Sequence, residues 1–156
     1  MRDIDVFFEA IRSGDKDRLK ALIHINPKLI NEKDARGFTP LILATYFDND
    51  VATQILINHK ADLNAKDASG NTALIGVSFK GNIALATTLL EHGADINAVN
   101  TNGVTALIFA TQYNKVAIVK LLLDYKADTN IKDKDGKTAL DYAREKQFDE
   151  IVALLG

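Results

Sequence analysis

The histidines are the first residues of this chain to consider for chemistry. His24, His59 and His92 are the only three, and the last two are 33 residues apart. If they occupy equivalent sites in adjacent units, packed helices place them roughly 8–10 Å apart. Two ligands of one zinc ion each lie only about 2 Å from it. With no third ligand evident, we expect no metal site, and we expect each histidine near a helix C-terminus, where a protonated ring is favourable.

The residues needed for catalysis are equally sparse. The serines are Ser13, Ser69 and Ser78, and none lies in a nucleophile-elbow motif. The chain has no cysteine, which removes thiolate catalysis, disulfides and Cys-ligated zinc. Residues 132–137 alternate in charge, which predicts a solvated turn, and they lack the glycine and glutamate spacing of a calcium loop. We expect a protein that is not an enzyme and that uses no cofactor.

The overall charge argues against two classes of partner. The formal net charge is -2, so the surface has no general attraction for nucleic acid or for an anionic membrane. No stretch approaches the roughly 18 apolar residues of a membrane span. The first ten residues enter an amphipathic pattern and show no apolar signal segment. We expect a cytoplasmic protein, although a chain that had lost its leader would have the same sequence.

The elements that must position any functional residue recur every 33 residues. Glycine opens four similar segments, at positions 37, 70, 103 and 136. Asparagine recurs with the same period at 31, 64, 97 and 130, and an Ala-Asp pair stands shortly before the last three. Two series that stay in phase over most of a chain indicate a genuine structural repeat.

The first of these segments shows how one unit is built. Residues 34–37 read Asp-Ala-Arg-Gly and predict a turn, because Asp accepts local backbone hydrogen bonds and Gly tolerates positive φ. Thr39 is then a good N-cap and Pro40 a good first helical residue. A helix over 40–47 and a second over 50–59 follow. Each pair has apolar faces that only stacked neighbours can bury.

These motifs resemble the ankyrin-repeat family over nearly the entire chain. The match consists of Asp-x-x-Gly-x-Thr-Pro-Leu, an alanine, a paired leucine and a terminal Ala-Asp-x-Asn, as in residues 34–64. The resemblance implies an all-α solenoid of five stacked helix-turn-helix units with short turn or β-hairpin tips. We expect one domain, residues 1–156, with an N-terminal cap unit 2–33, internal units 34–66, 67–99 and 100–132, and a C-terminal cap unit 133–156.

The chain departs from the family pattern at two kinds of position. The family's histidine after Thr-Pro-Leu is replaced by isoleucine in three units and by Asp141 in the last, so we expect apolar packing in place of its hydrogen bonds. The glycine that ends the second helix is kept at Gly93 but replaced by Lys60 and Lys126. A left-handed conformation at a lysine costs about 1–2 kcal/mol, and we expect this strain at both positions.

The resemblance also implies where a partner protein or peptide binds. In the family, partners touch the turn tips and the exposed side of the first helices, a surface that we call the concave wall. Gly76 holds a helix position on this wall. The residues carried over as partner-binding are Arg36, Phe38, Leu43, Tyr46, Phe47, Ser69, Asn71, Phe79, Lys80, Asn102, Val104, Phe109, Gln112, Tyr113 and Tyr142.

Helical spacing supports the wall independently. Leu41 and Ala44 share the face assigned to the core, whereas Leu43, Tyr46 and Phe47 share another. The chain has 7 phenylalanines and 4 tyrosines, and seven of these aromatic residues fall on the wall. Exposed aromatic side chains are good anchors for a partner. Two alternatives remain open. The rings could instead wedge between neighbouring helices, or the same stripe could join copies of this chain into a homo-oligomer; we expect a monomer.

Overall fold

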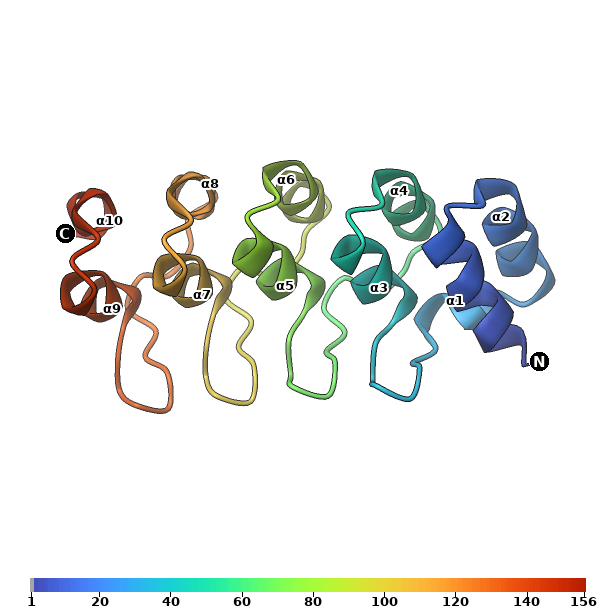
Figure 1. Cartoon of the computed structure of the whole chain (residues 1–156), viewed down its shortest axis with the longest axis horizontal. Helices are drawn as coiled ribbons and strands as arrows, with labels where there is room; N and C mark the ends of the chain where they lie inside the picture. Colours follow the sequence, from blue (N-terminus) through green and yellow to red (C-terminus); the bar gives the residue numbers. More distant parts are fainter. Residues whose placement is uncertain (1) are drawn as a thin grey trace.

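The computed structural model describes residues 2–156 as two parallel layers of helices (Figure 1). The inner layer is α1 (Asp3–Ser13), α3 (Pro40–Tyr46), α5 (Ala73–Lys80), α7 (Ala106–Gln112) and α9 (Ala139–Glu145). The outer layer is α2 (Lys16–Ile25), α4 (Asp50–Asn58), α6 (Ile83–Glu91), α8 (Val116–Asp124) and α10 (Asp149–Leu155), and a short 3-10 helix, η1 (Pro27–Asn31), follows α2.

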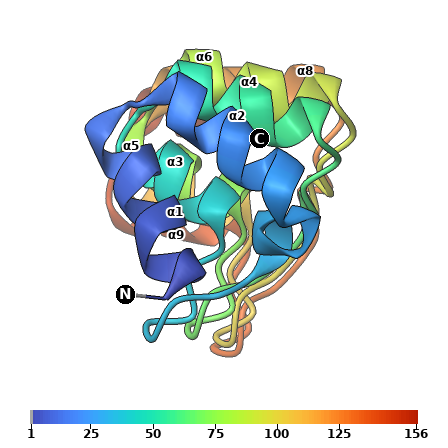
Figure 2. The ribbon, with the colours of Figure 1, turned by 90° about the vertical axis from the view of Figure 1, so that its right-hand side faces the viewer.

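The helices stack as the repeat predicts. In the inner layer each helix contacts the next one along the row, and in the outer layer α2 contacts α4, α6 contacts α8 and α8 contacts α10. The two ends of the chain lie at opposite ends of the stack (Figure 1). Seen along the stack, the turn tips project together from the side of the inner layer (Figure 2). The predicted all-helical solenoid of helix-turn-helix units is confirmed. Residues 2–156 contain no strand, and the tip at Asp34 is a turn closed by its backbone N–H to Phe38 O, 2.9 Å.

The start of each internal first helix follows from one capping residue. Thr39 Oγ1 accepts the backbone N–H of Ile42 at 3.1 Å, and Pro40 occupies the first helical position, as expected. The aspartate before it closes the turn, since Asp34 Oδ1 accepts the N–H groups of Arg36 and Phe38. The predicted ends of the helices at residues 47 and 59 are each one residue too long, because those residues are the C-caps.

The core lies between the two layers and absorbs the departures from the family pattern. Ile42, Ile75 and Ile108, which replace the family's histidine, are buried as expected. Asp141 at the fourth position is different: its Oδ2 accepts the N–H of Thr138 at 2.9 Å and completes a capping box at the start of α9. This carboxylate satisfies a helix terminus instead of packing against apolar neighbours.

The two lysines that replace glycine adopt the predicted conformation. Lys60 and Lys126 both have φ of 67°, and Gly93 at the equivalent position has φ of 91°. Each follows the C-cap residue of an outer helix, where the chain must reverse into the next tip. The fold therefore imposes the left-handed geometry at this position whether or not the residue is glycine.

The second periodic series joins neighbouring units. The side-chain Oδ1 of Asn31 accepts the backbone N–H of Asp62 at 2.9 Å. Asn64 and Asn97 repeat this contact one and two units further on. Because these amide oxygens bond the backbone of the following unit, the asparagine period of 33 residues reflects the stacking itself.

The histidines lie at helix ends, as expected. His59 and His92 are the C-caps of α4 and α6, and the Nδ1 atom of each is within 2.8 Å of a carbonyl oxygen in the preceding turn. His24 is in the last turn of α2. Within residues 2–156, no cluster of three or more His, Asp or Glu side chains could hold a metal ion. In the same residues, no helix combines the length and apolar composition needed to cross a bilayer.

Candidate functional site

Four large aromatic side chains on the inner layer face solvent. Tyr46 is 53% exposed, Phe47 48%, Phe79 41% and Tyr113 51%. They come from the last turns of α3, α5 and α7 or from the residues that cap them. Three successive units thus present rings on the same side of the stack. Exposed aromatic area of this extent is unusual for a surface with no contact to make.

The rings form two clusters separated by a gap. In the first, Tyr46 lies 6.1 Å from Phe38 and 5.2 Å from Phe47, ring centre to ring centre. In the second, Phe79 lies 5.6 Å from Phe109 and 4.6 Å from Tyr113, the latter pair edge to face. The edge-to-face pairs stabilise each other, so each cluster presents a pre-arranged apolar surface rather than independently moving side chains.

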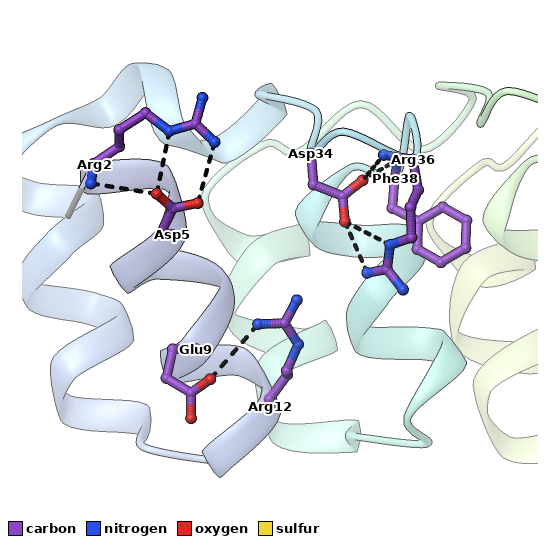
Figure 3. A network of polar contacts seen from close by, with 7 residues as sticks. All are labelled: Arg2, Asp5, Glu9, Arg12, Asp34, Arg36 and Phe38. Carbon is purple, nitrogen blue, oxygen red and sulfur yellow. Dashed lines mark hydrogen bonds and ion pairs between the residues drawn. The ribbon is translucent and has the colours of Figure 1, made fainter.

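An ion pair at the turn tip fixes the edge of the first cluster (Figure 3). Arg36 donates from Nη2 to Asp34 Oδ2 at 2.8 Å, and its guanidinium carbon lies 4.5 Å from the centre of the Phe38 ring. Partial burial opposes ionisation of Asp34, but hydrogen bonds from Arg36 and from two backbone N–H groups outweigh it and lower the carboxyl pKa. Arg36 is therefore held against the phenylalanine, so that the stacked pair forms one surface.

Lys80 links the two units on either side of the gap. Its ammonium group donates to the backbone oxygen of Tyr46 and to Asp48 Oδ2, the latter at 3.0 Å, and lies 5.3 Å from the centre of the Tyr46 ring. Hydrogen bonds from Asn82 and Lys80 lower the pKa of Asp48. Lys80 spans from α5 to the end of α3, so the positive charge on this part of the wall is already paired.

Between the clusters the wall is hollowed into a groove of about 340 Å³. Gly76 lies in its floor, and a Cβ atom built at this glycine would meet nothing within 4 Å. The period of 33 places Gly76 where Leu43, Phe109 and Tyr142 stand in the other units. The groove is thus the space that a missing side chain leaves. The other residues that line it are Phe38, Ile42, Thr45, Tyr46, Asp67, Asn71, Thr72, Ala73, Val77, Phe79, Lys80, Phe109 and Tyr113.

The exposed placement of two predicted wall residues is wrong. Leu43 is fully buried, and its helix α3 packs against both α1 and α5. Val104 is only 7% exposed. Its short side chain joins the hydrophobic core, whereas the larger Phe38 at the equivalent tip position remains partly exposed. Neither side chain can form part of a contact surface in this conformation.

The remaining predicted wall residues are at least partly exposed, although several are held by neighbours. The backbone oxygen of Ser69 accepts both the N–H and the hydroxyl of Thr101, and the amide oxygen of Asn71 accepts from Asn100 at 3.0 Å. The hydroxyl of Tyr142 donates to Asp133. The exposed members are Arg36, Tyr46, Phe47, Ser69, Phe79, Lys80, Asn102 and Tyr113, and the half-buried ones are Phe38, Asn71, Phe109, Gln112 and Tyr142.

The family model of ankyrin repeats (3 copies) matches residues 7–100 and, in a second overlapping match, residues 75–156. The chain belongs to the ankyrin-repeat family. Ankyrin repeats generally serve as scaffolds for protein–protein interaction, and the family is typically non-catalytic. A comparison with curated proteins gave no match.

In this ankyrin-repeat protein, seven of the residues that line the groove are missing from the predicted binding set: Ile42, Thr45, Asp67, Thr72, Ala73, Gly76 and Val77. The sequence predicts a turn at Asp34, to which Asp67 is equivalent by the repeat, and places Gly76 on the wall, yet both Asp67 and Gly76 line the groove. A signal for Gly76 was present in the sequence, since an isolated glycine inside a helix weakens it and needs a reason. For Asp67 no such signal exists, because the way in which its carboxylate is bonded depends on which side chain stands nine residues later in the chain.

Proposed function

We propose that this ankyrin-repeat protein binds a partner protein or peptide through the concave wall and does no chemistry on it. The observation that carries the proposal is the half-exposed aromatic surface on both sides of the groove, formed by three successive units. Burial of such rings is the main source of binding energy at protein interfaces. Packing of the rings between neighbouring helices accounts for Phe38 and Phe109, which are half-buried. It does not explain why the other four rings are exposed.

The location of the contact can be tested with two matched tyrosines. Tyr113 lies on the wall, and Tyr125 caps α8 in the outer layer with 39% of its surface exposed. A photo-crosslinking amino acid is placed at position 113 or at 125, and the protein is irradiated in lysate of the source cells. We expect a crosslinked protein from position 113 that is absent from position 125. The same product from both positions contradicts the proposal.

A pull-down with two triple variants tests the energy of the contact. Tyr46→Ala, Phe79→Ala and Tyr113→Ala remove rings from the wall, and Val51→Ala, Ile83→Ala and Tyr125→Ala remove exposed apolar groups from the outer layer as a control. With helicity matched by circular dichroism, we expect only the first variant to lose the partner. Light scattering over a range of concentrations identifies self-association through the wall, because a homo-oligomer must dissociate on dilution.

A further inference from the structure

Each of the four turn tips contains an acidic or amide residue. The tips differ in what bonds the outer polar atom of that side chain, which is Oδ2 in aspartate and Nδ2 in asparagine. Asp34 Oδ2 accepts from Arg36 at 2.8 Å. Asn100 uses Nδ2 to donate to Asn71 Oδ1 at 3.0 Å. Asp133 Oδ2 accepts the hydroxyl of Tyr142. In each of these three units, another side chain of the protein forms a hydrogen bond with the outer polar atom of the tip residue.

Asp67 is the exception. Its Oδ1 accepts the backbone N–H groups of Ser69 and Asn71, both at 2.9 Å, but Oδ2 has no hydrogen-bond partner among residues 2–156. Asp67 is half-buried and lines the groove. An ionised oxygen in a partly apolar site is more stable with a hydrogen-bond donor than without one. The groove therefore combines an apolar floor with one unused acceptor.

The last unit shows what fits such a site. Tyr142 stands nine residues after Asp133, and its ring crosses the wall to place the hydroxyl on Asp133 Oδ2. Nine residues after Asp67 stands Gly76, so the third unit lacks both the ring and the donor. The space over Gly76 and the free Oδ2 of Asp67 correspond to the ring position and the carboxylate oxygen of the fifth unit. There the phenol of Tyr142 fills the space and bonds the oxygen.

We propose that the groove over Gly76 receives one tyrosine side chain of the partner, with its ring between the two aromatic clusters and its hydroxyl donating to Oδ2 of Asp67. This inference rests on the proposed function of the wall. A neutral phenol avoids the like-charge repulsion that a cationic side chain would meet from Lys80, which lines the same groove, although the pairing of Lys80 with Asp48 weakens that repulsion. A phenylalanine would cover the carboxylate without donating a hydrogen bond to it.

Small analogues of side chains test this without the partner. The probes are p-cresol for tyrosine, toluene for phenylalanine and n-propylguanidinium for arginine, titrated into isotope-labelled protein and followed by NMR. We expect p-cresol to shift the signals of residues 73–80, and to bind about tenfold more tightly than toluene, the difference that a hydrogen bond to a charged group makes. Equal binding of toluene, tighter binding of propylguanidinium, or no binding by p-cresol overturns the inference.

Two variants separate the hydrogen bond from the shape of the groove. Asp67→Asn keeps an oxygen for the two tip N–H groups, as Asn100 does in the next unit, but replaces the free acceptor by a donor. It should weaken p-cresol about tenfold and leave toluene unchanged, and Asp124→Asn on α8 should change neither. Equal effects of Asp67→Asn on both probes contradict the assignment of the hydroxyl.

Gly76→Tyr restores the arrangement of the fifth unit within the chain. The introduced tyrosine should fill the groove, abolish p-cresol binding and titrate at higher pH than an exposed tyrosine, as expected for a hydroxyl bonded to Asp67. Retained p-cresol binding by this variant overturns the inference. If crosslinking shows a partner on the wall while the phenol tests fail, only the tyrosine assignment is lost. If the partner does not use the wall, the proposed function fails whatever p-cresol does.

Discussion

The hydroxyl of Tyr142 donates a hydrogen bond to Oδ2 of Asp133, and so ties the last inner helix to its own turn tip. Asp133 is buried at the base of that tip, where its Oδ1 also accepts the N–H groups of Asp135 and Lys137. Lys137 lies 5.4 Å from the centre of the tyrosine ring and pairs with Glu145 at 2.9 Å. Residues of the tip and of α9 are thereby bonded on two sides of one aromatic ring.

This pair predicts a stability that depends on pH at both extremes. Burial disfavours the Asp133 charge, but hydrogen bonds from Tyr142 and from two backbone groups outweigh it, so the pKa is lowered from its ordinary 3.8. The contribution of Asp133 is present above pH 3.8 and is lost as the pH falls through its folded-state pKa. The bond to Asp133 raises the pKa of Tyr142 from 10.0 to about 12. Its contribution is intact below pH 10.0 and disappears as the pH rises toward 12.

Tyr142→Phe tests both effects. We expect a loss of about 1 kcal/mol at neutral pH, the net value of one partly solvated hydrogen bond, and a difference from wild type that shrinks below pH 3.8. Urea unfolding over a pH series measures the loss of stability. In a titration followed by tyrosinate absorbance, the wild type should show one tyrosine that deprotonates at higher pH than the others, and the variant should lack it. A stability difference that is the same in acid as at neutral pH contradicts the role given to Asp133.

The strained lysines give a second prediction. Lys60→Gly and Lys126→Gly should each raise the free energy of unfolding by about 1 kcal/mol, because relief of left-handed strain exceeds the entropy that glycine adds to the unfolded chain. The matched control is Gly93→Lys, whose Cβ has nothing within 4 Å but whose φ is 91°, so any loss comes from the backbone alone. Thermal unfolding measures all three, and a lower melting temperature for both glycine variants contradicts the strain.

A buried hydroxyl gives a third prediction. Thr53 is fully buried and its Oγ1 has no hydrogen-bond partner in the structure. Two units further on, Val119 occupies the equivalent position and is also fully buried. Thr53→Val should therefore stabilise the protein by about 1 kcal/mol, a rise of about 2–4 °C in Tm.

The control for this prediction is Thr45→Val. The Thr45 hydroxyl donates to the backbone oxygens of Leu41 and Ile42, both at 3.0 Å, so its removal should lower Tm slightly. If both variants shift Tm in the same direction, the missing partner of Thr53 is not what determines its stability.

What could be predicted from the sequence is what repeats. The 33-residue period located the turns, the caps at Thr39 and its equivalents, the buried isoleucines and the left-handed lysines, because each depends on backbone geometry that every unit shares. What could not be predicted depends on the neighbouring unit. Leu43 and Gly76 hold the same repeat position, but Leu43 is fully buried whereas Gly76 lines the groove between two aromatic clusters. The size of side chains one unit away, rather than the repeat, decides such exposure.

Gly76 gives the last prediction, and it links stability to binding. Glycine inside a helix costs roughly 0.5–1 kcal/mol relative to alanine, and a Cβ at position 76 meets nothing within 4 Å. Gly76→Ala should therefore raise the free energy of unfolding by that amount. The same methyl group narrows the groove floor and should weaken p-cresol. Gly81→Ala, with φ of 81° and Lys115 at 3.2 Å, should instead destabilise and leave the probe unaffected.

Unfolding and p-cresol binding are measured on the wild type, Gly76→Ala and Gly81→Ala, and the results distinguish two roles for Gly76. A variant at position 76 that is more stable but binds less means that the residue keeps the groove open at the expense of the helix. A variant that is more stable and binds p-cresol as well as before means that the floor does not limit the ligand. The selectivity would then come from the rims, where Asp67 and the aromatic rings remain.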